Sequence, residues 1–283
     1  MPELPEVETI ARGVNTRVRG DRIVHAWFAA YRRLFKTSAA RQVKGLEGRI
    51  LVEVHRTGKH IVCELATAPK AIRPNRMKLQ PDAQWIVHLG MTGRLLVTTP
   101  DAPVAAHTHA RLELESGKEL RFVDPRRFGK LDFRDLNDGD AFNAAGAEPL
   151  IIAQDEFAAL FRGRKLTIKA ALLNQSLLSG VGNIYADESL FHAGIRPRRG
   201  AGRLTRAELE RLRLALKEVL EHAIQLGGSS VSDYVDAEGM RGFFQLEHCV
   251  YLRTGQPCRR CDTLISKIIV AGRGTHFCPK CQR

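Results

Sequence analysis

The sequence lacks any apolar run long enough to span a membrane. No run in the 283 residues approaches the ~18 residues that such a span requires. The first nine residues, MPELPEVET, have no apolar core of the kind found in signal peptides, so we expect no targeting segment there. Internal repeats and low-complexity tracts are also missing. We therefore expect a folded cytoplasmic protein with no membrane partner.

Acidic residues are too few to balance the basic ones. The chain has 31 acidic residues against 44 basic ones, which gives a formal charge of +13. An excess of this size predicts a polyanionic partner, and nucleic acid is the first candidate. Basic and apolar residues are interleaved, which favours a folded basic face over a disordered arm.

Cysteine is scarce, with six residues, and without a secretory signal we expect these thiols to be reduced or metal-bound. Four of them have the C-x₂-C, sixteen residues, C-x₂-C spacing of a zinc ribbon: Cys258, Cys261, Cys278 and Cys281. Two disulfides are the alternative, which the missing signal disfavours. Four thiolates leave no open coordination position, so the sequence predicts a structural zinc. Cys63 and Cys249 are predicted to be core residues and not ligands.

The hydrophobic pattern divides the chain into a strand-rich part and a helical part. Apolar residues have helical spacing over 5–18. Over 22–133 the period is two, which predicts six to eight short strands in a sandwich or barrel. The segment 146–150, GAEPL, marks a boundary, and helical spacing prevails after residue 155. The clearest helix, 204–226, starts with a capping-box pattern and stops at two glycines.

The N-terminus permits two interpretations. Pro5 and Glu6 suit the first turn of a helix, because proline fits there and a carboxylate complements the helix dipole. That interpretation leaves Pro2 unexplained. Once Met1 is removed, Pro2 carries a secondary α-amine with a pKa near ~8, which is partly unprotonated at neutral pH and can form an iminium with a sugar C1′. The neighbouring Glu3 then becomes a candidate proton carrier. From these nine residues alone, the helix start is the favoured interpretation.

Four further motifs have both an ordinary and a functional interpretation. Lys59 follows a Thr-Gly pair at a strand start, where a surface lysine is the ordinary case. The turn 88–93, HLGMTG, places a methionine between glycines, and the turn 124–129, DPRRFG, places two arginines and a phenylalanine after a strand. Such side chains are suited to wedging into a duplex. The amides of 180–183, GVGN, precede a helix and are candidates for binding phosphate, although an ordinary inter-helix turn is favoured.

Taken together, these motifs resemble the formamidopyrimidine-DNA glycosylase family, and they follow the family's order over nearly the whole chain. The resemblance implies an α+β multidomain fold. It would contain a two-layered β-sandwich with an N-terminal helix, a helical domain with a helix-two-turns-helix motif, and a β-ribbon zinc finger. The expected domains are a catalytic sandwich (1–145), a hinge (146–154), a helical DNA-binding domain (155–245) and a zinc finger (246–283).

The resemblance also implies an activity and the residues that carry it. The expected enzyme is a bifunctional DNA glycosylase and abasic-site lyase that excises 8-oxoguanine and formamidopyrimidines by a Schiff base on Pro2 and cleaves the strand by β- and δ-elimination. Glu3 is the acid–base partner, and Lys59 and Arg273 complete the catalytic set. Seven further residues match family positions near the lesion or on DNA: Glu6, Met91, His107, Arg126, Phe128, Lys165 and Asn183. Of these, Met91, Arg126 and Phe128 fill the gap left by the everted base.

The implied partners are one structural Zn²⁺, no organic cofactor, and duplex DNA carrying oxidised purines or abasic sites. A monomer in the bacterial cytoplasm, associated with the nucleoid, is the simplest expectation. Two alternatives stay open: an endonuclease VIII-like enzyme for oxidised pyrimidines, and a zinc-ribbon protein that binds damage without cutting. Three positions depart from the family pattern: Thr108 and Asn174 replace a usual aspartate, and Leu252 replaces a usual glycine.

Overall fold

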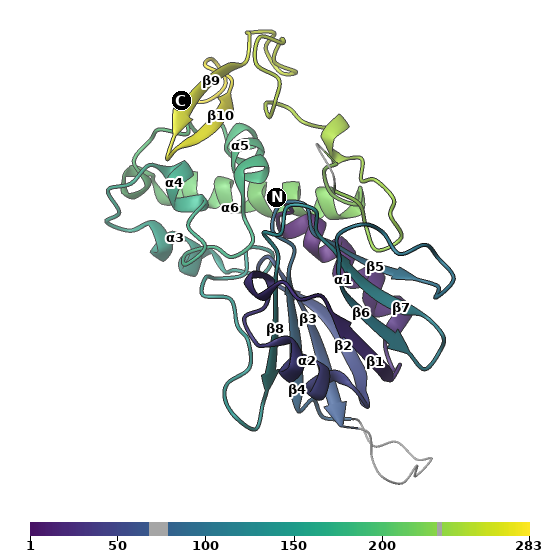
Figure 1. Cartoon of the computed structure of the whole chain (residues 1–283). Coiled ribbons are helices and arrows are strands. Elements are labelled where there is room, and N and C mark those ends of the chain that lie inside the picture. Colours follow the sequence, from purple (N-terminus) through teal and green to yellow (C-terminus); the bar gives the residue numbers. More distant parts are fainter. Residues whose placement is uncertain (68–78, 231–233) are drawn as a thin grey trace. The chain divides into compact units, whose positions relative to one another are not determined.

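The computed structural model describes residues 1–67, 79–230 and 234–283, and the chain forms two compact units. The first unit contains residues 1–2, 6–143 and 230–242, and the second contains residues 3–5, 144–229 and 243–283. Strands dominate the first unit and helices the second (Figure 1). In the described ranges, no helix has the length and apolar character needed to cross a membrane.

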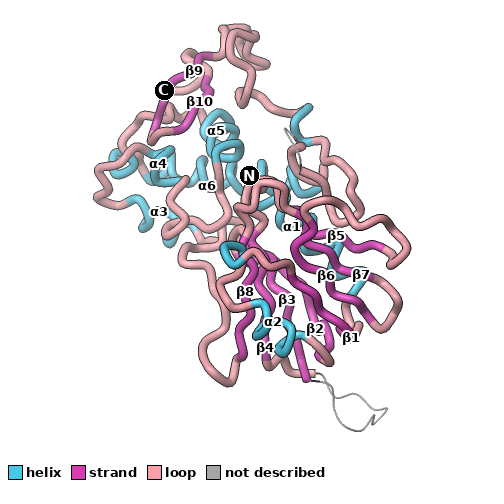
Figure 2. The backbone as a smooth tube through the Cα atoms, viewed as in Figure 1, coloured by secondary structure: helices cyan, strands magenta, loops and turns pink. Residues whose placement is uncertain are grey.

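The described part of the first unit contains two four-stranded antiparallel sheets (Figure 2). One has the order β1 (Ile23–Phe28), β6 (Thr108–Leu114), β7 (Glu119–Val123) and β5 (Arg94–Thr98). The other has the order β2 (Arg49–Thr57), β3 (His60–Thr67), β4 (Ala83–His88) and β8 (Lys130–Asp135). β6 and β7 form a hairpin, and they pair antiparallel with Leu112 opposite Leu120.

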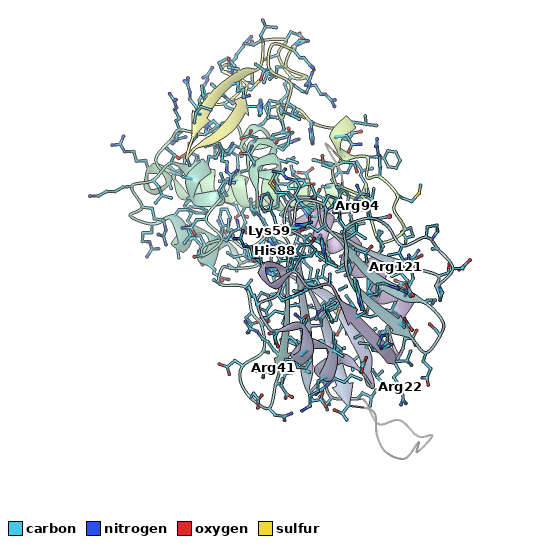
Figure 3. The ribbon with its side chains drawn as sticks, viewed as in Figure 1. Arg22, Arg41, Lys59, His88, Arg94 and Arg121 are labelled. Carbon is cyan, nitrogen blue, oxygen red and sulfur yellow. The ribbon has the colours of Figure 1, made fainter. Side chains whose placement is uncertain are left out.

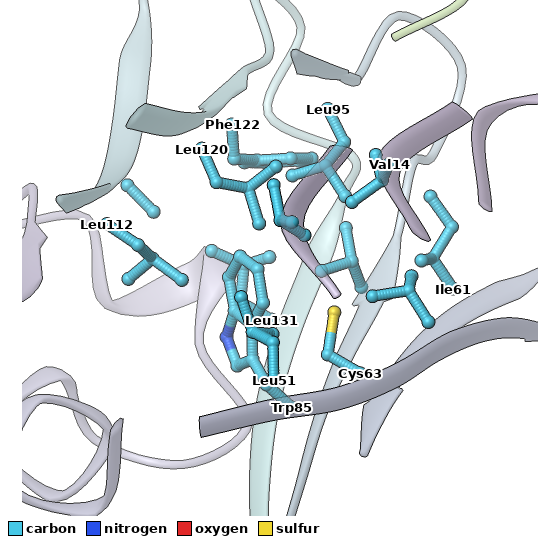
Figure 4. Close-up of a cluster of buried hydrophobic side chains, with 14 of the residues drawn as sticks. Val14, Leu51, Ile61, Cys63, Trp85, Leu95, Leu112, Leu120, Phe122 and Leu131 are labelled. Carbon is cyan, nitrogen blue, oxygen red and sulfur yellow. The ribbon is translucent and has the colours of Figure 1, made fainter. Parts of the chain in front are cut away.

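A single hydrophobic core joins the two sheets to helix α1 (Leu4–Val18). Trp85 of one sheet and Phe122 of the other are fully buried in it, and Val14 comes from the helix (Figure 4). Cys63 also lies in this core, as predicted. Apolar surface removed from water contributes roughly 25 cal/mol per Å², so this shared core is what holds the sandwich together.

Helix α2 (Ala39–Leu46) was not anticipated within the strand-rich part. Its N-cap is Ser38, whose hydroxyl accepts a hydrogen bond from the Arg41 amide. Gln42 is fully buried, and its side-chain oxygen accepts a 3.1 Å hydrogen bond from the indole of Trp85. The buried face of this helix therefore carries a polar residue that the period-two pattern did not reveal. A short 3₁₀ turn, Arg32–Leu34, precedes it.

The second unit contains α3 (Gln154–Phe161), α4 (Ile168–Leu172), α5 (Asn183–His192) and α6 (Arg206–Gln225). The predicted capping box of α6 is confirmed: Thr205 accepts from the Glu208 amide, and the Glu208 carboxylate accepts from the Thr205 amide. Gly227 and Gly228 end the helix with φ of 73° and 82°, values that only glycine adopts without strain. Two 3₁₀ turns, Ala201–Arg203 and Phe244–Leu246, complete the set.

The C-terminal ribbon consists of β9 (Ser266–Val270) and β10 (Arg273–Phe277), which pair antiparallel. Arg273 lies opposite Val270 at the turn, where its side chain is exposed.

Candidate active site and zinc site

Asp124 ties together two turns at one end of the first unit. Its carboxylate is fully buried and accepts hydrogen bonds from the Thr92 hydroxyl at 2.6 Å and the Gly129 amide at 2.8 Å. The turn 88–93 packs directly on the turn 124–129, because a Cβ at Gly90 would lie 2.5 Å from the backbone of Phe128. Gly90 also has a φ of 64°. Only glycine satisfies both conditions, so this residue lets the two turns meet.

Met91, Arg126 and Phe128 are brought together by these two turns. Met91 is 41% exposed and Phe128 is 52% exposed, so both apolar side chains are accessible to a ligand. The Arg126 guanidinium lies 5.1 Å from the centre of the Phe128 ring, within cation–π range. The three side chains form an exposed cluster that can insert between groups of a bound ligand.

Lys59 lies at the end of the other sheet of the first unit, next to the start of β3. His60 pairs with His88 across β3 and β4, and their rings are 4.9 Å apart. Figure 3 labels Lys59 and His88 at this end of the sheet. Burial lowers the pKa of His60 to about 4, and the cationic form is further disfavoured by His88. Burial also lowers the pKa of His88, with Lys59 as the next cause. Both rings are therefore neutral at pH 7, and the positive charge beside His88 comes from lysines: Lys59 has the largest effect, followed by Lys36 and Lys130.

The remaining residues of the first unit that the sequence singled out lie in different settings. Pro2 and Glu6 are buried, and the Tyr234 hydroxyl donates to the Glu6 carbonyl at 3.4 Å. His107 is exposed and has a φ of 64°. Its carbonyl accepts from the Asp124 amide at 3.0 Å, and the adjacent Thr108 hydroxyl donates to the Ala105 carbonyl at 2.6 Å.

In the second unit, Glu3 is held against the start of α5. Its carboxylate is 5% exposed and accepts hydrogen bonds from the amides of Ile184 at 3.3 Å and Tyr185 at 3.5 Å. A Cβ at Gly182 would lie 2.2 Å from the Glu3 carboxyl carbon, so only glycine leaves room for this carboxylate. The sequence predicted that amides at this helix start bind phosphate or form a simple turn. The Gly180 amide donates to the Gln175 side chain at 3.0 Å, and the amides that bind Glu3 are those of the next two residues after this turn, Ile184 and Tyr185.

A buried ion pair fixes the ribbon end that carries Arg273, and the sequence analysis missed it. Lys169 of α4 is fully buried, and its Nζ lies 2.5 Å from an Asp187 carboxylate oxygen of α5 and 2.8 Å from the Thr275 hydroxyl of β10. The Gly274 carbonyl accepts from Lys169 at 3.3 Å and from the Asn183 side-chain amide at 3.0 Å. Arg273 is thus covalently next to an anchored residue. In the sequence, Lys169 is the one charge of the short α4, and Asp187 stands beside Glu188 in α5, so nothing indicates that the two residues pair.

We expect Asp187→Asn to destabilise the second unit by about 3–5 kcal/mol, because it leaves the Lys169 charge buried without a counter-ion. Burial lowers the pKa of Lys169, and Asp187 opposes that shift. The measurement is urea unfolding followed by a probe in this unit. Asp155→Asn is the matched control, since Asp155 pairs with Arg206 at an exposed position and should cost under ~1 kcal/mol. Equal effects of the two substitutions would contradict the prediction.

Lys165 and Leu252 are the other marked positions of the second unit. Lys165 lies exposed in the loop between α3 and α4. Leu252, where the resemblance led us to expect glycine, has a φ of 60° and is 54% exposed. Asn174, another departure, uses its side-chain oxygen to accept from the Ser176 amide at 3.0 Å, which completes a turn.

We expect Leu252→Gly to raise the free energy of unfolding by about 0.5–1 kcal/mol. A residue with a Cβ in the left-handed region costs about 1–2 kcal/mol, and substitution by glycine removes this cost. Part of the resulting gain in stability is lost, because glycine has more conformational freedom in the unfolded chain. Little apolar burial is lost because Leu252 is half exposed. The free energy of unfolding is measured by thermal or urea unfolding of both proteins. A variant less stable than the wild type would show that the packing of the Leu252 side chain contributes more free energy than its left-handed backbone costs.

The four cysteines of the ribbon are arranged as a metal site. Sγ–Sγ distances are 3.3 Å for Cys261–Cys281, 3.5 Å for Cys261–Cys278 and 3.9 Å for Cys258–Cys281. A tetrahedral zinc with Zn–S bonds of about 2.3 Å requires about 3.8 Å between sulfurs. All four sulfurs lie within 4.8 Å of one another, so the set fits a closed four-thiolate zinc site. Such a site lacks an open position for substrate.

Cys249 is half-buried and packs against a small core cluster that contains Phe191, Val250 and Ile265. Its sulfur lies 3.8 Å from Nε2 of His192, and its backbone amide donates to Glu188 at 2.8 Å. The predicted core position is therefore only partly realised, because the residue also borders a cavity.

Three family profiles match the chain in succession. They are the Formamidopyrimidine-DNA glycosylase N-terminal domain over residues 1–131, the Formamidopyrimidine-DNA glycosylase H2TH domain over 146–235, and the zinc finger found in FPG and IleRS over 255–283. The zinc-finger match and the geometry of the cysteines together assign one structural zinc ion to the ribbon.

Relatives with this description span the full chain. A formamidopyrimidine-DNA glycosylase of Solibacter usitatus is 43% identical over 283 residues, with 100% of both chains covered. One of Corynebacterium glutamicum is 40% identical, with 100% of this chain and 99% of the relative covered. A structure of Lactococcus lactis Fpg in complex with DNA containing an abasic site superimposes with a TM-score of 0.85, 34% identity and 99% coverage of each chain.

Proposed function

Because the chain belongs to the formamidopyrimidine-DNA glycosylase family, and is therefore a DNA glycosylase of base excision repair, we propose that it excises oxidised purines from duplex DNA and then cleaves the strand. The single observation that carries the proposal is the setting of Glu3. A buried carboxylate, held by two helix amides, is the chain neighbour of a proline whose nitrogen becomes a free secondary amine when Met1 is removed.

In the proposed reaction, the Pro2 nitrogen attacks C1′ of the damaged nucleotide while the bond from C1′ to the base breaks. The base leaves with the bonding electrons and takes up the proton that the Pro2 nitrogen loses. Glu3 donates a proton to the ring oxygen as the sugar ring opens, so that an iminium links Pro2 to C1′. The iminium acidifies the C2′ proton. Loss of that proton expels the 3′ phosphate, and a second elimination, with loss of the C4′ proton, expels the 5′ phosphate. Hydrolysis of the iminium then frees Pro2.

Lys59 and Arg273 supply positive charge in this scheme. Lys59 assists at the lesion, and it is the lysine whose charge most lowers the pKa of His88. Arg273 binds the phosphate that leaves in the second elimination. The anchoring of Gly274 supports this role, since a fixed backbone reduces the freedom that Arg273 must lose on binding.

The target atom cannot be reached inside the base stack, so the damaged nucleotide must be everted at a cost of a few kcal/mol. We assign Met91, Arg126 and Phe128 to the space that it vacates, with Arg126 pairing with the orphaned cytosine. Wedging side chains restore part of the lost stacking. The exposure of Met91 and Phe128 supports this assignment, because exposed apolar groups gain by stacking on bases.

The DNA-binding surface proposed for the chain includes further contacts from Glu6, His107, Lys165 and Asn183. Solved relatives support DNA as the partner: Lactococcus lactis Fpg has been determined with DNA containing an abasic site and with DNA containing Fapy-dG. The formal charge of +13 agrees with a polyanionic ligand. We further propose a monomer that acts in the bacterial cytoplasm at the nucleoid.

We also propose the domain division expected from the sequence. It consists of a catalytic sandwich at 1–145, a hinge at 146–154, a helical DNA-binding domain at 155–245 and a zinc finger at 246–283. The change from strands to helices supports the position of the hinge, because β8 ends at Asp135 and α3 begins at Gln154.

Lesion preference is tested by single-turnover release of base from matched duplexes. We expect 8-oxoguanine opposite cytosine to be released at least about tenfold faster than thymine glycol, a difference of about 1.4 kcal/mol in the barrier. An abasic-site duplex is the control for strand cleavage. Faster release of thymine glycol would favour the oxidised-pyrimidine alternative. That alternative has some support, since a wild-type Lactococcus lactis Fpg has been solved with an oxidized pyrimidine containing DNA.

A further inference from the structure

Three side chains with metal-binding atoms meet in the second unit, apart from the zinc ribbon. Glu188 and His192 are four residues apart on α5, so they lie on the same face of the helix. Cys249 comes from the segment that leads to the ribbon. One ligand atom from each of the three lies within 4.8 Å of the others, and Cys249 Sγ is 3.8 Å from His192 Nε2. Atoms at such separations can contact one cation at the same time.

The chemistry of these donors selects the type of cation. A thiolate, an imidazole and a carboxylate are the three ligand classes that bind Zn²⁺, while a thiolate is a poor ligand for Mg²⁺ or Ca²⁺. The three donors border a cavity of about 430 Å³. Its remaining charged and imidazole lining consists of the carboxylates of Glu218, Glu221 and Glu247, the imidazole of His222 and one cation, the guanidinium of Arg259, so acidic groups outnumber basic ones. The cavity gives a cation a route to the three donors, and water or one of these side chains can take the fourth position.

Glu188 is pre-oriented by contacts that leave it able to bind metal. Its Oε1 accepts from the amides of Val250 at 3.0 Å and Tyr251 at 2.8 Å, and its Oε2 accepts only from the Cys249 amide at 2.8 Å among the described contacts. A carboxylate oxygen has two lone pairs, so Oε2 keeps one for a cation. The same three hydrogen bonds fix the segment that carries Cys249. Ligands held in place before binding lose little entropy when the metal arrives.

The His192 ring must change its tautomer to bind metal at Nε2. Its Nδ1 lies 3.3 Å from the Arg260 guanidinium, which can only donate, so the neutral ring carries its proton on Nε2. Metal binding moves that proton to Nδ1 and breaks the contact with Arg260. Arg260 keeps its position over the Phe191 ring at 4.4 Å and its hydrogen bond to the Phe191 carbonyl at 3.3 Å. The rearrangement therefore costs one hydrogen bond and leaves the local fold intact.

We propose that Glu188, His192 and Cys249 form a second divalent-metal site, which takes Zn²⁺ or another thiophilic cation in addition to the zinc of the four-cysteine ribbon. The Cys249 thiol releases its proton to solvent as the metal–sulfur bond forms. A bound cation connects the C-terminal end of α5 to the segment before the ribbon. By mass action it stabilises the second unit as free metal rises above the dissociation constant.

Metal content measures this site independently of catalysis. The untagged full-length chain, with its ribbon zinc in place, is titrated with Zn²⁺ against a colorimetric chelator, and bound zinc per chain is determined by mass spectrometry. We expect two zinc ions per chain for the wild type, and one for Cys249→Ser and for His192→Gln. Cys63→Ala is the matched control, because it removes a buried thiol of the first unit and should keep two.

Cobalt supplies a spectroscopic readout of the thiolate. Co²⁺ added to the zinc-loaded wild type should produce a thiolate-to-metal absorption band that is absent in Cys249→Ser. If Co²⁺ instead replaced the ribbon zinc, the same band would appear in both proteins, which would contradict the proposal. The melting temperature of the wild type should rise with Zn²⁺ more than that of Cys249→Ser. One zinc per chain in the wild type, or a second zinc retained by both variants, would overturn the proposal.

Discussion

Glu3→Gln is expected to slow release of the damaged base by about 10²–10⁴-fold, the range that a positioned acid or base contributes. Glutamine has nearly the same shape but cannot carry a proton. Breaking the bond to the base and opening the sugar ring both need proton transfer, so the rate of base release should fall the most. Cleavage of a pre-formed abasic site skips base release, and it should fall less. Single-turnover rates on 8-oxoguanine and abasic duplexes separate the two effects.

The control for this substitution must separate chemistry from folding. Glu3 accepts hydrogen bonds from the amides of Ile184 and Tyr185, and a glutamine oxygen can replace only part of that acceptance. We expect a stability loss of about 1–3 kcal/mol. Glu156→Gln, at an exposed position of α3, is the matched control and should leave both properties unchanged. A folded Glu3→Gln protein with the wild-type rate of base release would refute the role of Glu3.

An N-terminal extension that stays attached is expected to abolish strand cleavage, with a loss of at least about 10³-fold. The extension converts the Pro2 nitrogen into an amide, whose lone pair is delocalised and cannot attack C1′. Binding to an abasic-site duplex should change little, because the proposed phosphate contacts from Lys165 and Arg273 are intact. Both properties are measured on the same preparation.

The matched control for the extension is the same protein after removal of the added segment. A protease site placed immediately before Pro2 restores the free secondary amine without any substitution, and activity should return. Full strand cleavage by the extended form would exclude Pro2 as the nucleophile. Lys59 would then be the next amine to test, because it is the other amine in the proposed catalytic set.

Much of the fold could be predicted because local chemistry and tertiary structure agree in most elements. The period-two pattern marked strands such as β2 and β3, and Thr205 with Glu208 marked the start of α6. Helix α2 was missed because a buried glutamine, Gln42, occupies its inner face and satisfies the Trp85 indole. A polar residue with a specific buried partner looks the same in sequence as a polar residue in solvent.

The site was predictable where a motif repeats a known chemical pattern, and less so where function depends on packing. The four ribbon cysteines follow from spacing alone. Lys169 and Asp187 were missed, since they are 18 residues apart in the sequence and only the fold brings Nζ and carboxylate to 2.5 Å. The contact of Glu3 with the amides of Ile184 and Tyr185 was missed for the same reason. Cys249 was expected in the core; it packs against a core cluster and also borders a cavity, which no sequence pattern indicated.

The central claim is that the Pro2 nitrogen forms a covalent intermediate with DNA. The most direct test is borohydride trapping on a duplex with 8-oxoguanine opposite cytosine, followed by mass spectrometry of the linked peptide. A reduced adduct on the nitrogen of Pro2 is the predicted result. If removal of Met1 is verified and neither this duplex nor an abasic-site control is trapped, the claim is contradicted and the chain binds damage without cutting it.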